Sequence, residues 1–291
     1  MAVLNALSID LEDWFHAELV RAHVREDWPE WRVEWAVEPI LLLLQEHGVK
    51  ATFFVVGDVL RHHRELIRRI YEEGHEIACH GWSHRPLWEL APERFAWELA
   101  EFDRELESLV PLEEVVGFRA PTFSLDERTS WALNILQEQG YLYDSSIFPM
   151  RTGLYGVPGA PSHPYRPVAD DLLHDHPEGP LLEFPLPVVH LAGVPVPLAG
   201  GFYLRFWPLG LLLALLRRLN AQGYPFVLYL HPWEADVQTP RVRGLSLWER
   251  FVTYYNARSV LSKMRVLLQS FAFAPLKEVL GVGQRRGGRR K

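Results

Sequence analysis

Short apolar runs alternate with helical patterns along the first 140 residues, and this alternation limits the possible folds most strongly. The strand-like runs cover residues 3–9, 51–57, 75–80 and 114–119, and the helical patterns cover residues 36–48, 64–74, 91–109 and 126–140. Most of these helical patterns end at a glycine, which is a usual stop signal. Strand and helix alternating at this spacing predict an α/β protein with a parallel sheet, either open or closed into a barrel.

The middle of the chain interrupts this rhythm. Residues 148–201 are rich in proline and glycine, and their best strand candidate is residues 181–189. Regular patterns then return, with helices expected at residues 207–223 and 259–271 and a strand at residues 226–230. No repeat or low-complexity linker divides the chain, so we expect a single catalytic domain over residues 1–275. A basic tail, 276–291, follows, and its end has no apolar residue from Gly283 to Lys291 and is expected to be disordered.

The composition limits which binding partners and which cellular compartment we expect for this protein. The net charge of −7 argues against a nucleic-acid partner. The single cysteine, Cys79, rules out an internal disulfide and fits a reducing compartment. The longest apolar run, Leu209 to Leu216, is far shorter than the roughly 20 residues that cross a bilayer. We therefore expect no transmembrane segment. No secretory signal is visible at the start, so we expect a cytoplasmic location, with peripheral membrane association as the alternative.

Polar residues stand where several of the expected strands end. The first strand leads to Asp10, the third to His80, the fourth to Arg119 and the late strand to His231, while His84 follows His80 closely. The carboxyl ends of parallel strands lie on one face, and that face carries the active site. We therefore expect these side chains to converge.

The first of these strand ends is crowded with acids. The stretch LSIDLEDWFH contains Asp10, Glu12 and Asp13 within four residues. Neighbouring carboxylates repel, and burying them is costly unless a cation compensates. Side chains alternate along a strand, so Glu12 points to the same side as Asp10 and Asp13 does not. We favour Glu12 as the partner of Asp10 and keep Asp13 as the alternative ligand or as a helix cap.

The stretch HGWSH places three residues between His80 and His84. This spacing alone is more often a pair of surface histidines, but its position after a strand favours a metal site. Two imidazoles, a carboxylate and open positions form a catalytic metal site, with Zn²⁺ as the first choice. The ligand types also suit Co²⁺, Ni²⁺, Fe²⁺ or Mn²⁺. Without further information, Arg119 and His231 could equally be an ordinary edge arginine and a loop histidine.

Six stretches together resemble a known family. SIDLEDWF, ATFFVVGD, GHEIACHGWSH, GFRAPTFSLD, YDSSIFP and YLHPWE occur in this order. They resemble the motifs of polysaccharide deacetylases, carbohydrate esterase family four, also called the NodB homology family. YGVPGAP, PLAGGFYLR and PRV add a resemblance to the subgroup found with exosortase and exopolysaccharide gene clusters. The resemblance extends from about Leu4 to Phe273.

The resemblance implies a distorted (β/α) barrel of about seven strands. It also implies a metal-dependent hydrolase that removes acetyl groups from an N-acetylated polysaccharide or oligosaccharide, in exopolysaccharide biosynthesis. By the same resemblance the site residues are Asp10 as catalytic base, His80, His84 and Glu12 or Asp13 as metal ligands, Arg119 as the arginine that orients the base, and His231 as catalytic acid. Pro121, Trp14 and Trp233, which lie beside these motifs, are expected to contact the substrate.

Two departures from the family pattern affect these expectations. The family's first motif commonly has two adjacent aspartates, whereas Asp10, Glu12 and Asp13 are spaced differently here, which puts the third ligand in question. The subgroup's late arginine–histidine pair is replaced by Val252 and Thr253, so specificity can differ. Two other functions remain open: a metal-dependent amidase acting on a small cyclic amide or on peptidoglycan, and a carbohydrate-binding protein without catalysis.

Overall fold

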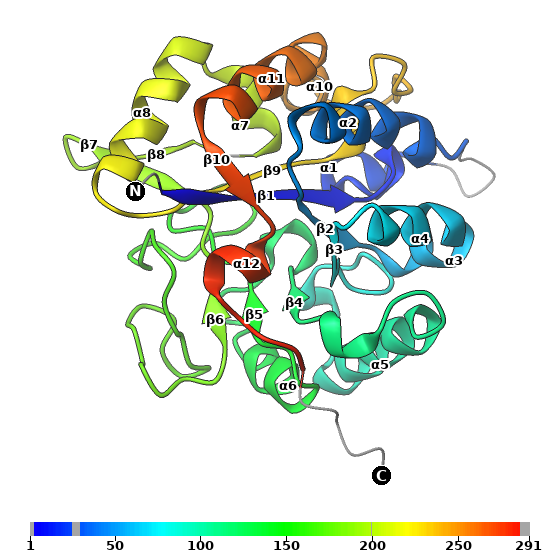
Figure 1. Cartoon of the computed structure of the whole chain (residues 1–291), viewed down its shortest axis with the longest axis vertical. Coiled ribbons are helices and arrows are strands. Elements are labelled where there is room, and N and C mark those ends of the chain that lie inside the picture. The colour runs from blue at the N-terminus through cyan, green and yellow to red at the C-terminus, as the bar shows by residue number, and fades with distance from the viewer. Residues whose placement is uncertain (1–2, 25–29, 199, 286–291) are drawn as a thin grey trace.

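A curved parallel sheet forms the centre of the molecule (Figure 1). The computed structural model describes residues 3–24, 30–198 and 200–285. Seven strands follow one another in the order β10-β1-β2-β3-β4-β5-β6, and β9 also pairs with β1. All of these pairings are parallel. The sheet curls into a half-barrel, which confirms both the predicted parallel α/β class and the predicted distorted (β/α) barrel.

The strands of this sheet are β1 (Leu4–Leu11), β2 (Thr52–Val55), β3 (Glu76–Cys79), β4 (Gly117–Phe118), β5 (Tyr143–Asp144), β6 (Leu182–Glu183), β9 (Val227–Leu230) and β10 (Ala272–Ala274). A separate antiparallel hairpin consists of β7 (Val188–Leu191) and β8 (Val194–Pro197).

The helices lie outside the sheet, and α2, α4 and α5 follow one another along one side of it (Figure 1). The helices are α1 (Glu18–Arg21), α2 (Val33–His47), α3 (Gly57–His62), α4 (Arg64–Glu72), α5 (Pro92–Leu106), α6 (Ala132–Glu138), α7 (Gly201–Phe206), α8 (Leu209–Ala221), α9 (Pro232–Ala235), α10 (Leu247–Tyr254), α11 (Val260–Ser270) and α12 (Leu276–Leu280). The 3₁₀ turns are η1 (Trp14–His16), η2 (Leu87–Glu89), η3 (Leu112–Glu114), η4 (Pro121–Phe123) and η5 (Ala257–Ser259). Among the described residues, no helix is long and apolar enough to cross a membrane.

The central strands are buried on both faces, and this explains their sequence. All residues of β2 and β3 are buried, and so is β1 after its first residue. Parallel strands covered by helices read as nearly continuous apolar runs rather than as alternating ones. The polar residues that interrupt these runs are therefore conspicuous, and several of them belong to the site.

The structure departs from the predicted elements mainly in the second half of the chain. The strand expected at residues 181–189 is divided into β6 and the start of β7, and α7, α10 and β10 fall outside the predicted elements. Both α7 and α10 are short, and a pattern of six to eight residues carries little periodic signal.

The expected tail begins later than residue 276. Its first residues form α12, and Leu276 of this helix is fully buried. Arg285 also donates a hydrogen bond to Asp103, at 2.7 Å. Apolar packing and this ion pair therefore keep residues 276–285 with the body of the protein. The remaining residues of the predicted tail, 286–291, lie outside the described part of the chain.

Candidate active site

Functional side chains from four strands meet at the carboxyl edge of the sheet. Asp10 lies near the end of β1, and His80, Arg119 and His231 each follow the last residue of β3, β4 and β9. Because β1 pairs with β9 in parallel, and β2 to β4 continue in parallel from its other side, these ends are brought together. The convergence predicted from the strand ends is present.

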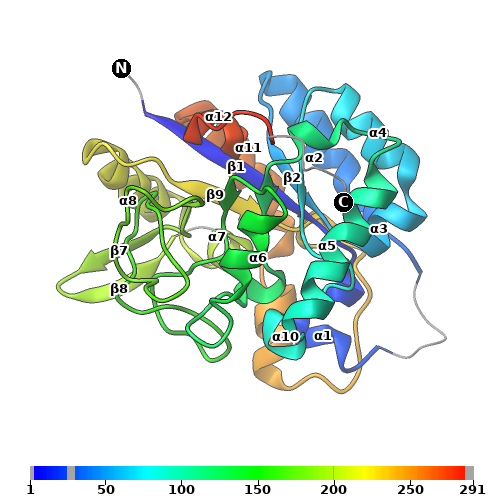
Figure 2. The same ribbon diagram turned by 90° about the horizontal axis from the view of Figure 1, so that it is seen from below.

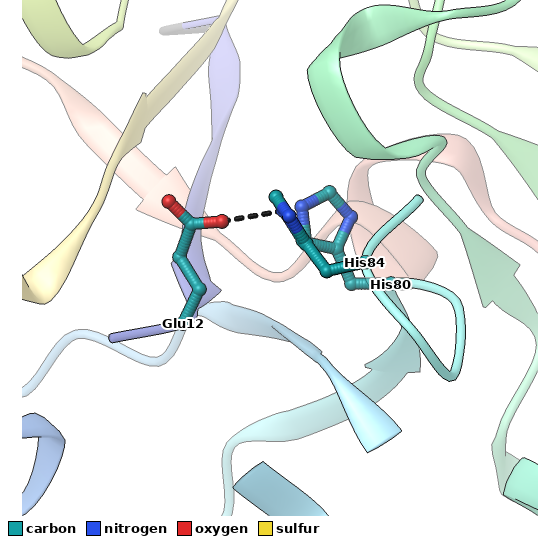
Figure 3. Close-up of side chains that lie close together, drawn as sticks. All are labelled: Glu12, His80 and His84. Carbon is teal, nitrogen blue, oxygen red and sulfur yellow. Dashed lines mark ion pairs between the residues drawn. The ribbon is translucent and has the colours of Figure 1, made fainter. Parts of the chain in front are cut away.

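Glu12, His80 and His84 form one compact cluster (Figure 3). Each offers a ligand atom, and the three atoms lie within 4.8 Å of one another. All three residues are buried, with exposed fractions of 2–6%. Glu12 Oε2 lies 2.5 Å from His84 Nε2, the pair marked in Figure 3. Among the described residues this is the cluster of histidine and acidic side chains with the spacing to hold a metal ion.

The hydrogen bonding of both imidazoles fits metal coordination. Neither ring nitrogen of His84 has a hydrogen-bond partner among the described residues, so the short approach of Glu12 does not have hydrogen-bond geometry. His80 Nδ1 lies 2.7 Å from the carbonyl oxygen of Arg119, which can only accept, so Nδ1 carries the proton and Nε2 keeps a free lone pair. A backbone carbonyl that fixes the tautomer in this way is typical of a metal-ligating histidine.

The charges of the cluster suit a divalent cation. Burial lowers the pKa of His80 to about 4, so its imidazole is neutral at pH 7. Burial opposes ionisation of Glu12, but the attraction of His84 and His231 outweighs it and holds the Glu12 pKa well below its ordinary value. Trp233 donates its indole N–H to Glu12 Oε1 at 2.9 Å, which fixes the carboxylate. Two imidazoles and one carboxylate match the donor set of a catalytic zinc site.

The loop that carries the two histidines is held by a buried glutamate. Glu98 of α5 is 1% exposed and accepts hydrogen bonds from the backbone N–H groups of Trp82 and Ser83 and from the Ser83 hydroxyl. This anchoring supports the left-handed backbone of His84, whose φ is 55°. His80 and His84 therefore come together because the loop between them is bent, and not because they share one face of a helical turn.

Asp10 faces the cluster and is bound by Arg119. The guanidinium donates to Asp10 Oδ1 at 2.6 Å and to the Ser8 hydroxyl at 2.8 Å. It also donates to the carbonyl and the hydroxyl of Ser145, both at 2.9 Å, and lies 4.1 Å from the centre of the Phe54 ring. Arg119 is completely buried, so this pair is shielded from solvent and fixed in orientation.

His231 lies close to both Asp10 and Glu12. Its Nε2 lies 3.8 Å from both Asp10 Oδ2 and Glu12 Oε1. Its Nδ1 donates to Glu234 Oε2 at 2.9 Å, and Arg205 donates to Glu234 Oε1 at 2.8 Å. Burial opposes protonation of His231, but Glu12 and Glu234 raise its pKa to about 9. At neutral pH the imidazole can therefore donate a proton from Nε2.

Three other predicted site residues, Asp13, Trp14 and Pro121, are held in contacts that stabilise the fold. Asp13 accepts hydrogen bonds from the backbone N–H groups of Trp14, Arg32 and Val33, at 2.6–2.8 Å, so it caps η1 and ties it to the start of α2. Trp14 is only 1% exposed and packs against Trp233 and its neighbours. Pro121 is also buried, at the start of η4. The rings of Trp14 and Pro121 are thus almost fully covered by protein, and their contact with a substrate stays a prediction.

Sequence reasoning missed Glu234 and Arg205. Glu234 stood three residues after His231, the spacing at which a glutamate reaches back to a residue that caps a helix, and the two do form such a reciprocal pair. Arg205 gave no local signal, because it meets Glu234 only through the tertiary fold. It is 1% exposed and donates to three backbone carbonyls around the end of α10, those of Val252, Thr253 and Tyr255.

Comparison with known families divides the chain into two matched regions. Residues 27–143 match the polysaccharide deacetylase family, and residues 145–281 match a domain of unknown function, DUF3473. A chitooligosaccharide deacetylase from Sinorhizobium fredii is 32% identical over 138 residues, which cover 47% of this chain and 64% of that protein. One from Bradyrhizobium sp. is 38% identical over 82 residues, 28% of this chain and 37% of that protein. The chain thus spans less than two thirds of the length of either relative.

Solved structures share the architecture. A crystal structure described as a candidate polysaccharide deacetylase from Mycobacterium smegmatis superposes with a TM-score of 0.58 at 21% identity, over 100% of this chain and 95% of that one. At this identity the likeness concerns the fold. The matched family region contains His80, His84 and Arg119, while Asp10, Glu12 and His231 join them through the sheet. Residues 27–143 therefore form a polysaccharide deacetylase domain, which shares one sheet with the DUF3473 region.

Proposed function

We propose that this protein is a metal-dependent deacetylase that removes acetyl groups from an N-acetylated polysaccharide or oligosaccharide and releases acetate. One observation carries this proposal: an Asp10–Arg119 pair and a His231–Glu234 pair both lie beside the buried Glu12–His80–His84 cluster. Amide hydrolysis needs an activated water, a base that takes its proton and an acid that protonates the amine, and this arrangement supplies a group for each task.

Glu12, His80 and His84 would hold the cation. A divalent ion bound there would lower the pKa of a water molecule and stabilise the negative charge that develops on the acetyl oxygen. Zn²⁺ is our first choice because two imidazoles and one carboxylate suit it, and Co²⁺, Ni²⁺, Fe²⁺ and Mn²⁺ remain compatible with the same ligands.

The remaining steps fall to the protein side chains. Asp10 takes the proton of the attacking water, and Arg119 orients the Asp10 carboxylate through its hydrogen bond to Oδ1. His231 gives its Nε2 proton to the nitrogen that leaves the acetyl carbon. The amide C–N bond breaks, and the products are acetate and a glycan with a free amine.

The substrate is proposed from the relatives. Two relatives are named chitooligosaccharide deacetylases, and a structure that superposes with a TM-score of 0.51 is a peptidoglycan N-acetylglucosamine deacetylase. We infer an N-acetylated glucosamine-type glycan as substrate and a role in exopolysaccharide assembly. Val252 and Thr253 lie beside Arg205, to which both offer their carbonyl oxygens, so the departure from the subgroup pattern lies close to the Glu234–His231 pair.

Acetate release from chito-oligosaccharides and from peptidoglycan fragments tests this function. We expect acetate release that stops after chelation and returns when Zn²⁺ or Co²⁺ is added. Asp10→Asn should bind the metal as the wild type does but lose roughly 10²–10⁴-fold in kcat, the usual contribution of a general base. Full activity of a chelated, metal-free sample would refute the metal mechanism. Ring opening of cyclic amides without acetate release would instead identify an amidase.

A further inference from the structure

Large apolar side chains protrude from neighbouring parts of α7 and α10. Leu247 exposes 86% of its surface and Trp248 exposes 65%. Phe206 and Tyr255 expose 41% and 39%. Single exposed apolar residues are ordinary on a protein surface, but a contiguous group of this kind usually marks an interaction site.

These side chains form one continuous surface. Ring centres of Phe202 lie 6.4 Å from Trp248 and 5.6 Å from Phe251, which joins α7 to α10. Phe206 and Tyr255 make a second contact between the two segments, at 6.5 Å. We call this surface the aromatic patch; it consists of Phe202, Phe206, Leu247, Trp248, Phe251 and Tyr255.

The aromatic patch is built on a firm base. The opposite side of α10 is buried at Thr253, and Tyr254 packs against the group that contains Trp14 and Trp233. Arg205 fixes the end of α10 through its bonds to backbone carbonyls. The exposed rings are therefore held in place on the outer side of a packed helix.

The chain segment that carries most of the aromatic patch is basic, although the whole chain has a net charge of −7. From residue 241 to residue 258 the chain carries four arginines and one acid, a local net charge of +3. The arginines, Arg241, Arg243, Arg250 and Arg258, are all exposed. The acid, Glu249, is engaged as the reciprocal cap of Ser246. This excess of positive charge favours an anionic partner.

We propose that the aromatic patch docks the protein on an anionic lipid surface. Protruding leucine and aromatic side chains beside arginines are what a helix lying at a bilayer interface needs, because the apolar groups enter the headgroup boundary and the cations meet the lipid charge. A sugar-binding surface would instead be concave and carry convergent polar groups, and a protruding Leu247 adds nothing to it.

The aromatic patch lies near the candidate active site, so docking would bring that site close to the bilayer. Helix α10 packs beside α1, which follows the carboxyl end of β1, and Figure 2 shows α1 and α10 together at one edge of the molecule. The aromatic patch therefore lies toward the edge of the sheet that carries Glu12 and His231. A docked protein would hold this edge close to glycans that are attached to, or emerging at, the bilayer.

Vesicle sedimentation tests the docking with the full chain. We expect the wild type to sediment with vesicles of mixed phosphatidylcholine and phosphatidylglycerol but not with phosphatidylcholine alone, and to be released as salt rises. The double variant Leu247→Ser/Trp248→Ser should bind the mixed vesicles at least about tenfold more weakly. Its matched control is Trp35→Ser/Leu42→Ser on α2, where the two side chains are 64% and 53% exposed; this variant should bind as the wild type does.

A second variant separates charge from apolar insertion. Arg250→Gln/Arg258→Gln keeps the aromatic patch and should lose the preference for anionic over neutral vesicles. Circular dichroism and acetate release from a soluble oligosaccharide should be unchanged in all variants, because the altered side chains are exposed and outside the catalytic cluster.

Four outcomes would overturn the proposal. The first is a wild type that sediments with neither kind of vesicle, and the second is equal binding by Leu247→Ser/Trp248→Ser and its control. The third is a wild-type dimer, seen by light scattering, that only Leu247→Ser/Trp248→Ser disrupts, which would assign the aromatic patch to a second copy of the chain. The fourth is competition between soluble chito-oligosaccharide and vesicles for the wild type, which would assign it to glycan.

Discussion

Glu12 and Asp13 are adjacent carboxylates with opposite surroundings. Glu12 faces two imidazoles and one indole N–H, whereas both oxygens of Asp13 are taken by backbone N–H groups. We predict that Glu12→Ala loses bound metal, while Asp13→Ala keeps it but is destabilised by about 2 kcal/mol because a buried cap is lost. Metal analysis of the purified variants, together with denaturant unfolding, measures both effects. Equal metal content in Glu12→Ala and wild type would remove Glu12 from the ligand set.

Glu234 holds His231 in the tautomer that leaves Nε2 facing the cluster. The variant Glu234→Gln keeps the shape but loses the charge, so the Nδ1 proton is no longer secured. We predict that kcat falls by roughly 10²–10⁴-fold with little change in metal content, because the acid rather than the metal site is disturbed. Glu249→Gln is the matched control, because Glu249 occupies the same capping position in α10 and lies away from His231. An unchanged kcat in Glu234→Gln would contradict the assigned role of Glu234.

Asp144 and Glu183 form a buried acid pair that the proposed mechanism does not use. They stand opposite each other in β5 and β6, and both are completely buried. Burial raises the pKa of both residues, and Asp144 raises that of Glu183 further, so the pair keeps a proton to a higher pH than ordinary carboxyl groups do. Ser146 and Ile147 donate to this pair, so it fixes the loop whose Ser145 binds Arg119.

This pair predicts that the difference in stability between the variant Glu183→Gln and the wild type depends on pH. The folded state binds one more proton than the unfolded state above the ordinary glutamate pKa, so its contribution to the free energy of unfolding falls as pH rises. Glu183→Gln carries an amide N–H in place of that proton and removes this slope. We therefore expect the stability of Glu183→Gln relative to the wild type to increase between pH 5 and pH 9, as measured by denaturant unfolding. Glu178→Gln, at an exposed site in the same segment, should show a constant difference. A parallel pH profile in Glu183→Gln would refute the shared proton.

At the scale of elements, the short strand β4 can pack against β5 only because a glycine, Gly117, leaves room for the neighbouring side chain. A Cβ added at Gly117 would lie 2.0 Å from the ring of Tyr143 on the neighbouring β5, and Tyr143 is fixed by its hydrogen bond to Glu76. We predict that Gly117→Ala lowers the free energy of unfolding by about 3 kcal/mol. Gly210→Ala in α8 is the control, because nothing lies within 4 Å of its added Cβ. It should change stability by no more than about 1 kcal/mol. Equal unfolding midpoints of the two variants would contradict this packing argument.

At the scale of the whole molecule, the two family regions share one sheet. Strands β9 and β10, from the DUF3473 region, pair with β1 at the start of the chain, and His231 follows β9. We predict a single cooperative unfolding transition for the full chain in calorimetry. A fragment ending at residue 144 should lack a stable fold, because β1 would lose both of these partners and expose its edge. Two separate transitions, or a folded fragment, would show that the regions are independent.

The sequence by itself determined the alternation of strands and helices and the residues at the strand ends. These signals are local: period, glycine stops and the position of Asp10, His80, Arg119 and His231 can be read along the chain. The rule that parallel strands end on one edge then brought these residues together, because it needs only strand direction.

Only the tertiary structure decided which groups surround them. Arg205 reaches Glu234 across 29 residues, and Ser145 reaches Arg119 across 26. The rings of α7 and α10 meet although more than 40 residues separate Phe202 from Trp248. Such contacts leave no periodic trace, because they depend on how whole elements pack. For the same reason the structure, and not the spacing of the acids, decided that Asp13 is saturated by backbone N–H groups while Glu12 faces the histidines.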